Sequence, residues 1–345
     1  MEQFLKEDRQ LFGRFAPTPT GPLHVGNGYT AILSWVASRS LGEGQLLRID
    51  DLDLRALPAG CLDAQLSDLA WLELDYDESP ALGGAVPPYR QSERSSLYQS
   101  ALAHLNELGL LYPCTCSRRE VAAYAPHDTD GVPIYQGHCR PKNPTPLPSL
   151  SLPPRDGRRP ALRINLPAAF NLLKTKGSAL LSESGAVVSF QDAVWGRQSY
   201  ALNTALGDFV LRRGDGVYAY QLACAVDDGL QSAGLIVRGA DLLSSTARQL
   251  IIIELLGLPR PRYAHCALIV DDTGERLAKR RESTTLAGLN AAGVSSAALR
   301  AYLSTLWGGP GVSDWRALIE SFSLTQLPKT PARWDPLQLN AYEGR

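Results

Sequence analysis

A turn near the N-terminus carries residue types that can bind a nucleotide. The segment RFAPTPTGPLHVGN (Arg14–Asn27) ends a predicted strand and opens a predicted helix. Backbone N–H groups and the positive end of the helix then lie beside the turn, which favours an anion such as a phosphate. The His24 imidazole could donate to that phosphate, and Gly26 would let a ribose or a base approach the backbone. The alternative interpretation is a proline-rich turn with a helix-capping histidine.

Three aspartates follow a second predicted strand. Asp50, Asp51 and Asp53 come directly after Gln45–Ile49, at the strand end where open α/β sheets bind ligands. Their carboxylates repel one another unless a positive group lies among them, such as an ammonium, a metal ion or arginines. The alternative is a solvated acidic loop.

Two later segments supply cations. Arg238 follows an apolar run and precedes Gly239, so its guanidinium could lie in a pocket and bind a carboxylate through two hydrogen bonds. The alternative is a structural ion pair with Asp228 or Asp241. The basic run Gly274–Arg281 precedes a predicted helix and could hold a polyphosphate, although basic runs are common on protein surfaces.

Three of the six cysteines cluster in one part of the chain, at Cys114, Cys116 and Cys139. Two thiolates this close in sequence can share one metal ion, and Cys139 could close the site. Zinc prefers four tetrahedral ligands, and the candidates for the fourth are His127, His138 and Tyr135. Because tyrosine is a rare ligand and His138 adjoins Cys139, the spacing alone favours His127. The alternative is a set of unrelated buried cysteines.

The elements that must position these residues alternate between strand and helix in the N-terminal third of the chain. This alternation is typical of βαβ units and a parallel sheet. The predicted strands are Leu11–Ala16 and Gln45–Ile49; the predicted helices are Leu23–Gly42, Cys61–Leu74 (with Leu62, Leu66, Leu69 and Trp71 or Leu72 at helical spacing) and Ser92–Leu108.

The pattern changes after Pro113, where seven prolines between Pro141 and Pro160 indicate an extended loop. Beyond the loop the α/β pattern returns, and after Arg281 it becomes helical. The later predicted elements are strands at Ala161–Leu166, Ala186–Phe190 and Leu235–Arg238 and helices at Ala247–Leu256 and Ser296–Leu306.

Composition limits the function classes. The chain has 345 residues with 34 basic and 35 acidic side chains, a net charge of −1, so any contact with a nucleic acid would need a local basic patch. The first ten residues have no apolar core of a signal peptide, and the best apolar run, Leu250–Leu258, is broken by Glu254 and too short to span a membrane. We therefore expect a cytoplasmic protein without a disulfide framework.

Taken together and in this order, these motifs resemble the class I aminoacyl-tRNA synthetases of the glutamyl type. His24–Asn27 (HVGN) resembles the HIGH signature, and Arg276–Arg280 (RLAKR) resembles the KMSKS signature. The segment RFAP followed by TPTG is close to specific for the glutamyl and glutaminyl branch. The stretch after Arg281 is too short for the usual large anticodon-binding region. With the Cys-x-Cys and Tyr-x₃-Cys pattern, the chain therefore resembles the glutamyl-Q tRNA(Asp) synthetase family, whose members are free-standing catalytic cores.

The resemblance implies an α/β fold: a Rossmann-type parallel sheet of class I synthetases, a zinc-containing insertion and a short helical C-terminal region. The implied division is a first catalytic half at 1–110, the insertion with its proline-rich loop at 111–200, a second catalytic half at 201–281 and the helical region at 282–345. The implied reaction is activation of L-glutamate with ATP, without tRNA, and transfer to the queuosine base in the anticodon of tRNA(Asp). A monomer with no membrane partner is expected.

The resemblance also assigns residues. It implies glutamate binding by Arg14, Ala16, Thr18, Asp50, Tyr220 and Arg238; ATP binding by His24, Gly26, Asn27 and Lys279, with His24 and Lys279 as the catalytic pair; and one structural zinc ion on Cys114, Cys116, Tyr135 and Cys139. Mg²⁺ is expected with ATP. Three residues depart from the family pattern, because Asp50 replaces a glutamate, Arg276 a lysine and Ala278 a serine.

These departures keep other functions open. Loss of the serine hydroxyl near ATP removes one hydrogen bond, worth on the order of 1 kcal/mol, so we expect weakened activation. The alternatives are a truncated glutamyl-tRNA synthetase that charges a tRNA 3′ end, a non-catalytic tRNA-binding paralogue, and an amino-acid ligase acting on a small molecule or a carrier protein.

Overall fold

The computed structural model describes residues 10–127, 133–155, 157–275, 277 and 284–342. Its central part is built on parallel strands, as the sequence predicts. Strand β1 (Phe12–Phe15) runs parallel to β2 (Gly44–Leu47), and helix α1 (Val25–Ser40) connects them. Both strands are buried along their whole length. Helix α1 ends beside Gly42, which adopts the left-handed conformation with φ of 68° that commonly follows a helix.

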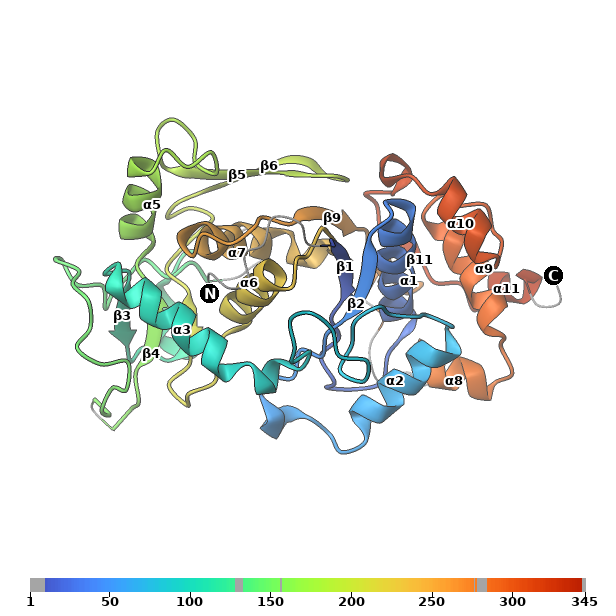
Figure 1. Cartoon of the computed structure of the whole chain (residues 1–345), viewed down its shortest axis with the longest axis horizontal. Helices are drawn as coiled ribbons and strands as arrows, with labels where there is room; N and C mark the ends of the chain where they lie inside the picture. Colours follow the sequence, from blue (N-terminus) through green and yellow to red (C-terminus); the bar gives the residue numbers. More distant parts are fainter. Residues whose placement is uncertain (1–9, 128–132, 156, 276, 278–283, 343–345) are drawn as a thin grey trace.

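The second half of the central fold contributes β8 (Leu235–Gly239) and β9 (Arg262–Cys266), which are also parallel. Helix α6 (Tyr220–Leu230) precedes β8, and α7 (Leu243–Leu255) connects it to β9. The two halves meet where the Gly234 N–H donates to the Phe12 carbonyl at 2.8 Å. The carboxyl ends of β1 and β8 therefore lie side by side, with α1 packed on both (Figure 1).

A second, antiparallel sheet lies at one end of the molecule, on the left in Figure 1. Its order is β3 (Leu111–Cys114), β4 (Ala161–Ile164) and β7 (Val210–Arg212). The helices around it are α3 (Ser95–Glu107), α4 (Arg118–Tyr124) and α5 (Leu166–Thr175). The proline-rich stretch is anchored to α3, because the Asn106 side chain bonds both backbone groups of Leu147 at 2.8 and 2.9 Å.

Strands that precede residue 200 pair with strands that follow it. Strand β7 pairs with β4, whereas β5 (Val187–Asp192) pairs with β9 of the central sheet and forms a hairpin with β6 (Gly196–Ala201). The hairpin extends over the top of the molecule in Figure 1. The domain boundary that the sequence predicts at residue 200 stays a prediction.

The C-terminal helices cover α1 on the side away from the insertion (Figure 1). They share its core, since the Trp35 ring lies 4.5 Å from that of Trp315 and the Tyr29 ring 6.0 Å from that of Trp307. The elements here are α8 (Leu286–Ala291), α9 (Ser296–Leu306), α10 (Trp315–Ser321), α11 (Pro336–Leu339), and the parallel pair β10 (Ile269–Val270) and β11 (Ala332–Arg333).

One residue of a predicted helix face is wrong. Helix α2 (Cys61–Trp71) forms where the sequence predicts it and buries Leu69, but Leu66 is 37% exposed. The buried residues of the helix also include Cys61, Gln65 and Asp68. The two polar ones turn inward because they bond the backbone of a neighbouring loop, which compensates their loss of hydration.

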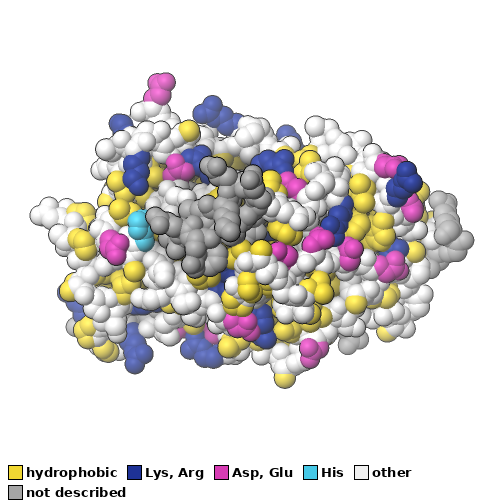
Figure 2. All heavy atoms as spheres, viewed as in Figure 1, with side chains coloured by type: hydrophobic (Ala, Val, Ile, Leu, Met, Phe, Trp, Pro, Cys, Tyr) yellow, Lys and Arg dark blue, Asp and Glu magenta, His cyan; other side chains and the backbone are white. Residues whose placement is uncertain are grey.

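The molecular surface carries both signs of charge. Figure 2 shows basic and acidic side chains spread over the same face, in agreement with the net charge of −1. Within the described ranges, no helix combines the length and apolar character needed to cross a bilayer. All six cysteines lie in those ranges and are free thiols.

Candidate functional site

A cavity of about 530 Å³ opens where the carboxyl ends of the central strands meet the start of α1. Residues that follow β1, β2, β8 and β9 line it. The lining includes every residue predicted to contact glutamate and the described residues predicted to contact ATP: Arg14, Ala16, Thr18, Asp50, Tyr220 and Arg238 for the first group and His24, Gly26 and Asn27 for the second. Lys279 lies outside the described residues.

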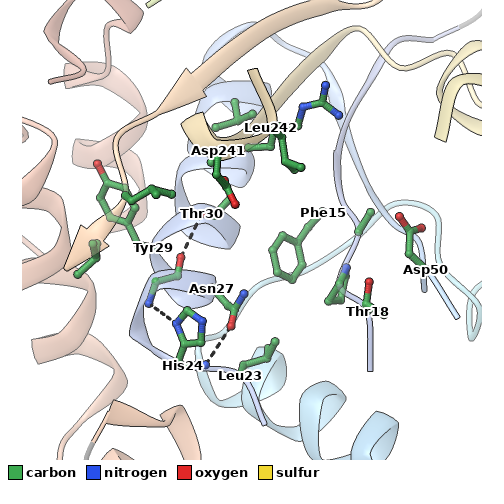
Figure 3. Close-up of a pocket in the computed structure, with 18 of the residues that line it drawn as sticks. Phe15, Thr18, Leu23, His24, Asn27, Tyr29, Thr30, Asp50, Asp241 and Leu242 are labelled. Atoms are coloured by element: carbon green, nitrogen blue, oxygen red, sulfur yellow. Dashed lines mark hydrogen bonds between the residues drawn. The ribbon is translucent and has the colours of Figure 1, made fainter. Parts of the chain in front are cut away.

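The His24 ring caps the N-terminus of α1. Its Nδ1 accepts the Gly26 N–H at 3.1 Å, while the Asn27 side-chain oxygen accepts the His24 N–H at 3.1 Å (Figure 3). Since Nδ1 is an acceptor, the proton of the neutral ring is on Nε2. A Cβ on residue 26 would lie only 3.0 Å from the His24 ring, so glycine leaves room for this cap. The capping alternative and the phosphate-donor interpretation are thus compatible.

Arginines neutralise the three aspartates after β2. Asp50 pairs with Arg48 at 2.7 Å, Asp51 with Arg90 at 2.8 Å, and Asp53 with both Arg55 and Arg213. The sequence left an ammonium, a metal ion or arginines as the positive groups among these aspartates, and in the structure arginines fill that role. Asp50 and Asp51 are buried, so the solvated acidic loop does not describe them.

Arg48 links Asp50, which lines the cavity, to Asp228 behind the lining. Its side chain is fully buried and reaches Asp50 and Asp228, each at 2.7 Å. Arg14 reaches the same Asp228 through Nε and Nη2 at 3.1 and 3.2 Å. Burial opposes ionisation of Asp228, but Arg14 and Arg48 outweigh it and hold the pKa of that carboxyl well below its usual range. These side chains therefore form a closed network of ion pairs.

Asp50 belongs to this network and also faces the cavity. Burial raises its pKa from the ordinary value, and Arg48 opposes that rise. Both carboxylate oxygens contact Arg48, and Oδ2 also lies 3.6 Å from the Cys224 thiol. A carboxylate offers about four lone-pair sites, so an ammonium could still bind Asp50 by sharing it with Arg48.

Arg238 differs from these arginines. Its Nε and Nη2 donate to the uncharged His265 ring and the Thr246 hydroxyl, at 3.1 and 2.6 Å. Among the described residues its buried Nη1 has no hydrogen-bond partner. The side chain lines the cavity at 3% exposure. A buried guanidinium with an open donor is suited to a carboxylate ligand.

Two residues of α2 hold the turn between β1 and α1. The Gln65 amide donates to the Gly21 carbonyl at 2.6 Å and to the Thr18 carbonyl at 3.3 Å. Asp68 accepts a hydrogen bond from the Leu23 backbone, and burial raises its pKa to about 6. Sequence reasoning missed both, although their spacing of three residues, on the side of the helix that also carries Cys61 and Leu69, was a usable signal.

The cysteine cluster lies beside β3, at the edge of the antiparallel sheet. The sulfurs of Cys114, Cys116 and Cys139 lie within 4.8 Å of one another. The Tyr135 hydroxyl lies 3.4 Å from the Cys114 sulfur and 3.7 Å from the Cys116 sulfur. With Zn–S bonds of about 2.3 Å, tetrahedral zinc would need sulfurs roughly 3.8 Å apart. These four side chains therefore fit a zinc ion, and this geometry favours Tyr135 over His127 as the fourth ligand.

Arg163 contributes charge to the cluster. Its guanidinium lies 4.0 Å from the Tyr135 ring centre. Burial opposes ionisation of Cys114, but Tyr135 and Arg163 lower the pKa of its thiol below the ordinary value. Three thiolates on one Zn²⁺ leave an excess negative charge, which Arg163 is positioned to balance.

Comparison with known proteins assigns the fold to a family. Residues 10–143 and 180–337 match the family described as tRNA synthetases class I (E and Q), catalytic domain. The chain belongs to this family. It is accordingly an enzyme of the class I synthetase type, a ligase, and its central sheet is the class I synthetase sheet.

Relatives in this family carry two names. A glutamyl-Q tRNA(Asp) synthetase of Symbiobacterium thermophilum is 41% identical over 340 residues, which cover 97% of this chain and 99% of that protein. A protein of the same name from Nitratidesulfovibrio vulgaris is 43% identical and is matched over 86% of each chain. Glutamate–tRNA ligase 2 of Acidithiobacillus ferrooxidans is 38% identical, but the match covers 96% of this chain and only 66% of the ligase.

Among solved structures, a glutamate tRNA ligase from Elizabethkingia meningosepticum in complex with its amino acid superimposes with a TM-score of 0.77. The superposition covers 97% of this chain and 69% of the ligase at 24% identity. At this identity the likeness establishes the shared fold.

Proposed function

We propose that this enzyme activates glutamate with ATP and transfers the glutamyl group to the queuosine base in the anticodon of tRNA(Asp). The observation that carries the proposal is the match to a glutamyl-Q tRNA(Asp) synthetase over 97% of this chain and 99% of that protein. The cavity supports it, because the expected glutamate-binding residues and the described ATP-binding residues line one space.

Activation needs no covalent nucleophile from the protein. An oxygen of the glutamate α-carboxylate bonds to the α-phosphorus of ATP as the bond to the pyrophosphate oxygen breaks, which leaves glutamyl-adenylate and pyrophosphate. Negative charge gathers on the phosphorus oxygens, so the protein acts by positioning and charge stabilisation. In this proposal the His24 Nε2–H and the start of α1 stabilise that charge with Lys279, and Mg²⁺ accompanies the phosphates.

The other end of the cavity would hold the amino acid. Arg238 would bind a carboxylate through its open Nη1 donor, and Asp50 would accept a hydrogen bond from the ammonium. Burial raises the pKa of Tyr220, so its phenol stays protonated and can donate to the substrate. Arg14 would act with Asp228 behind the lining of the cavity.

Transfer to the tRNA is the second step. A hydroxyl of the queuosine ring attacks the carbonyl carbon of the adenylate, gives up its proton and forms an ester as AMP leaves. Unpaired anticodon bases can be splayed out and stacked on aromatic or arginine side chains. With charges of both signs on the surface, we expect the RNA contact to be a local one.

The test compares two forms of tRNA(Asp). With ATP and radioactive glutamate, we expect label to enter queuosine-containing tRNA(Asp) and not tRNA(Asp) that lacks queuosine. Glutamate-dependent ATP–pyrophosphate exchange should proceed without any tRNA. Equal labelling of the two tRNAs would contradict the proposed acceptor, and absent exchange would contradict activation.

A second candidate is charging of a tRNA 3′ end. The match to a glutamate–tRNA ligase over 96% of this chain favours it. The same labelling experiment separates the two when it is repeated with tRNA whose 3′-terminal adenosine has been removed by a 3′ exonuclease, because such a tRNA cannot accept glutamate at its 3′ end. Label that survives removal of the 3′ end supports the anticodon acceptor.

We further propose one structural zinc ion on Cys114, Cys116, Tyr135 and Cys139. A site with four protein ligands has no open position for a substrate, so the metal would hold the loop between α4 and β4 rather than take part in the reaction. Chelation should accelerate hydrogen exchange in the described residues of 113–140. Unchanged exchange after metal removal would contradict a structural role.

A further inference from the structure

The Arg238 guanidinium is held by neutral groups on two sides. Its Nε–H donates to His265 Nε2 at 3.1 Å, and its Nη2 donates to the Thr246 hydroxyl at 2.6 Å. Thr246 lies on α7 and His265 on β9. Two neighbouring elements therefore hold the guanidinium of Arg238, which extends from β8. The side of the guanidinium that carries Nη1 has no partner among the described residues.

Asp192 decides which nitrogen of His265 can accept. Its Oδ2 lies 2.6 Å from His265 Nδ1, while its Oδ1 accepts the N–H groups of Val194 and Trp195, each at 2.9 Å. An ionised carboxylate only accepts hydrogen bonds, so Nδ1 carries the ring proton and Nε2 keeps its lone pair for Arg238. The pairing is long-range in sequence, since Asp192 ends β5 and His265 lies in β9.

The directions of the pKa shifts of Asp192 and His265 favour the same arrangement. Burial opposes ionisation of Asp192, but its bonds to His265 and to backbone N–H groups lower the pKa of the carboxyl. Burial lowers the pKa of His265, with Asp192 opposing and Arg238 adding to the effect. A neutral ring beside an ionised aspartate is therefore the favoured state.

We propose that Asp192, His265 and Thr246 form a positioning relay that orients Arg238 so that Nη1 meets a carboxylate of the amino-acid substrate. This inference rests on the proposed function. The charge balance explains why neutral partners matter: Asp228 already pairs with Arg14 and Arg48, whereas Arg238 is oriented by groups that leave its charge available. A substrate carboxylate then becomes its counter-ion in a buried site, where an unpaired charge is costly.

Matched substitutions separate orientation from packing. His265→Gln keeps an acceptor near the position of Nε2, whereas His265→Asn is too short to reach Arg238. Thr246→Ser keeps the hydroxyl, and Thr246→Val removes it at nearly equal volume. Asp192→Asn presents an N–H to His265 Nδ1, so the ring proton moves to Nε2 and opposes the Arg238 N–H.

The readout is glutamate-dependent ATP–pyrophosphate exchange with separate KM values for glutamate and ATP. His265→Asn, Thr246→Val and Asp192→Asn should each raise the KM for glutamate about 10- to 100-fold, the usual effect of losing one hydrogen bond to a charged group. The KM for ATP should change little. His265→Gln and Thr246→Ser should recover most of the loss, and thermal unfolding identifies any variant that fails to fold.

The outcomes distinguish this inference from the function it rests on. Wild-type protein without glutamate-dependent exchange overturns the proposed function and the inference with it. Active wild-type protein with equal glutamate KM in His265→Asn and His265→Gln overturns the inference alone. Equal rises in the KM values for glutamate and for ATP would indicate a general structural role and would also overturn the inference.

Discussion

At the proposed amino-acid end of the cavity, buried arginines and aspartates hold one another, whereas the proposed nucleotide end is formed largely by a backbone turn. Arg48 joins Asp50 to Asp228. At the other end, residues of the turn after β1 and of the start of α1 line the cavity. The first end depends on the identity of its side chains, and the second depends on whatever holds the turn in shape.

This contrast assigns different vulnerabilities to the two ends. Removing one member of a buried ion network leaves a desolvated charge behind, which is among the most damaging single changes. A backbone site tolerates side-chain replacement as long as its supports remain. Here the supports are the His24 cap, with Asn27, and the polar face of α2, with Gln65 and Asp68.

The largest effect is expected for Arg48→Met. Methionine fills a similar volume but leaves the buried Asp50 without its arginine partner and Asp228 with Arg14 alone. We expect a loss of about 3–5 kcal/mol in the free energy of unfolding, as found when one partner of a buried pair is removed. Urea denaturation measures it, and Arg55→Met is the control, because Arg55 is exposed. Equal losses in both variants would refute the contrast.

At the nucleotide end, His24→Asn should separate catalysis from capping. Asparagine is a good N-cap, so α1 should keep its stability while the imidazole is lost. We expect ATP–pyrophosphate exchange to fall roughly 10²-fold or more, the usual cost of losing one such donor. His24→Ala should lose about 1 kcal/mol of stability in addition. Exchange at the wild-type rate in either variant would exclude His24 from catalysis.

Gln65→Leu should weaken ATP binding through the backbone. The substitution removes the hydrogen bonds to the Gly21 and Thr18 carbonyls, each worth about 1 kcal/mol. The KM for ATP should rise about fivefold or somewhat more, with a smaller change for glutamate. Leu66→Gln alters the exposed side of the same helix and serves as the control. If both KM values rose together, the two ends would not be independent.

The smallest effect is expected for Asp68→Asn, and it depends on pH. The pKa of Asp68 in the folded protein is about 6, raised by burial from 3.8. The folded state therefore binds this proton more tightly than the unfolded chain does, so stability is lost as the pH rises from about 4 through 6. Asparagine keeps an acceptor for Leu23 without the charge. The variant should gain on the order of 1 kcal/mol at pH 8 and lose that part of the pH dependence.

Unfolding curves of the wild-type protein and Asp68→Asn between pH 4.5 and pH 8 measure this difference. Equal stability of the two proteins across that range would contradict burial as the source of the raised pKa.

The sequence predicted the local parts of this structure well. The helix Ser296–Leu306 has the predicted bounds, and β1, α1 and β2 form in the predicted order. These elements are encoded by apolar periodicity and by nearby breakers such as Gly42, so no distant contact is needed to find them. The cavity could be anticipated because strand ends of a parallel sheet meet at one edge.

The supports of the site were harder to predict, because they join residues far apart in the chain. The ion pairs of Arg48 with Asp228 and of Asp192 with His265 join residues that lie far apart in the sequence, so local patterns do not reveal them. Gln65 and Asp68 were missed because only the apolar residues of their helix were used to predict its buried side. For helix α7, the predicted start at Ala247 came late, since the structure begins it at Leu243.

The pairing of β10 with β11 gives the end of the chain a mechanical role. Ile269 lines the cavity and is joined in register to Ala332, while the Leu286 N–H bonds the Leu23 carbonyl next to His24. Cleavage of the chain before Ala332 would remove the strand partner of Ile269, although none of the residues that line the cavity would be lost. Truncated or tethered variants should therefore keep β11, so that β10 retains its strand partner.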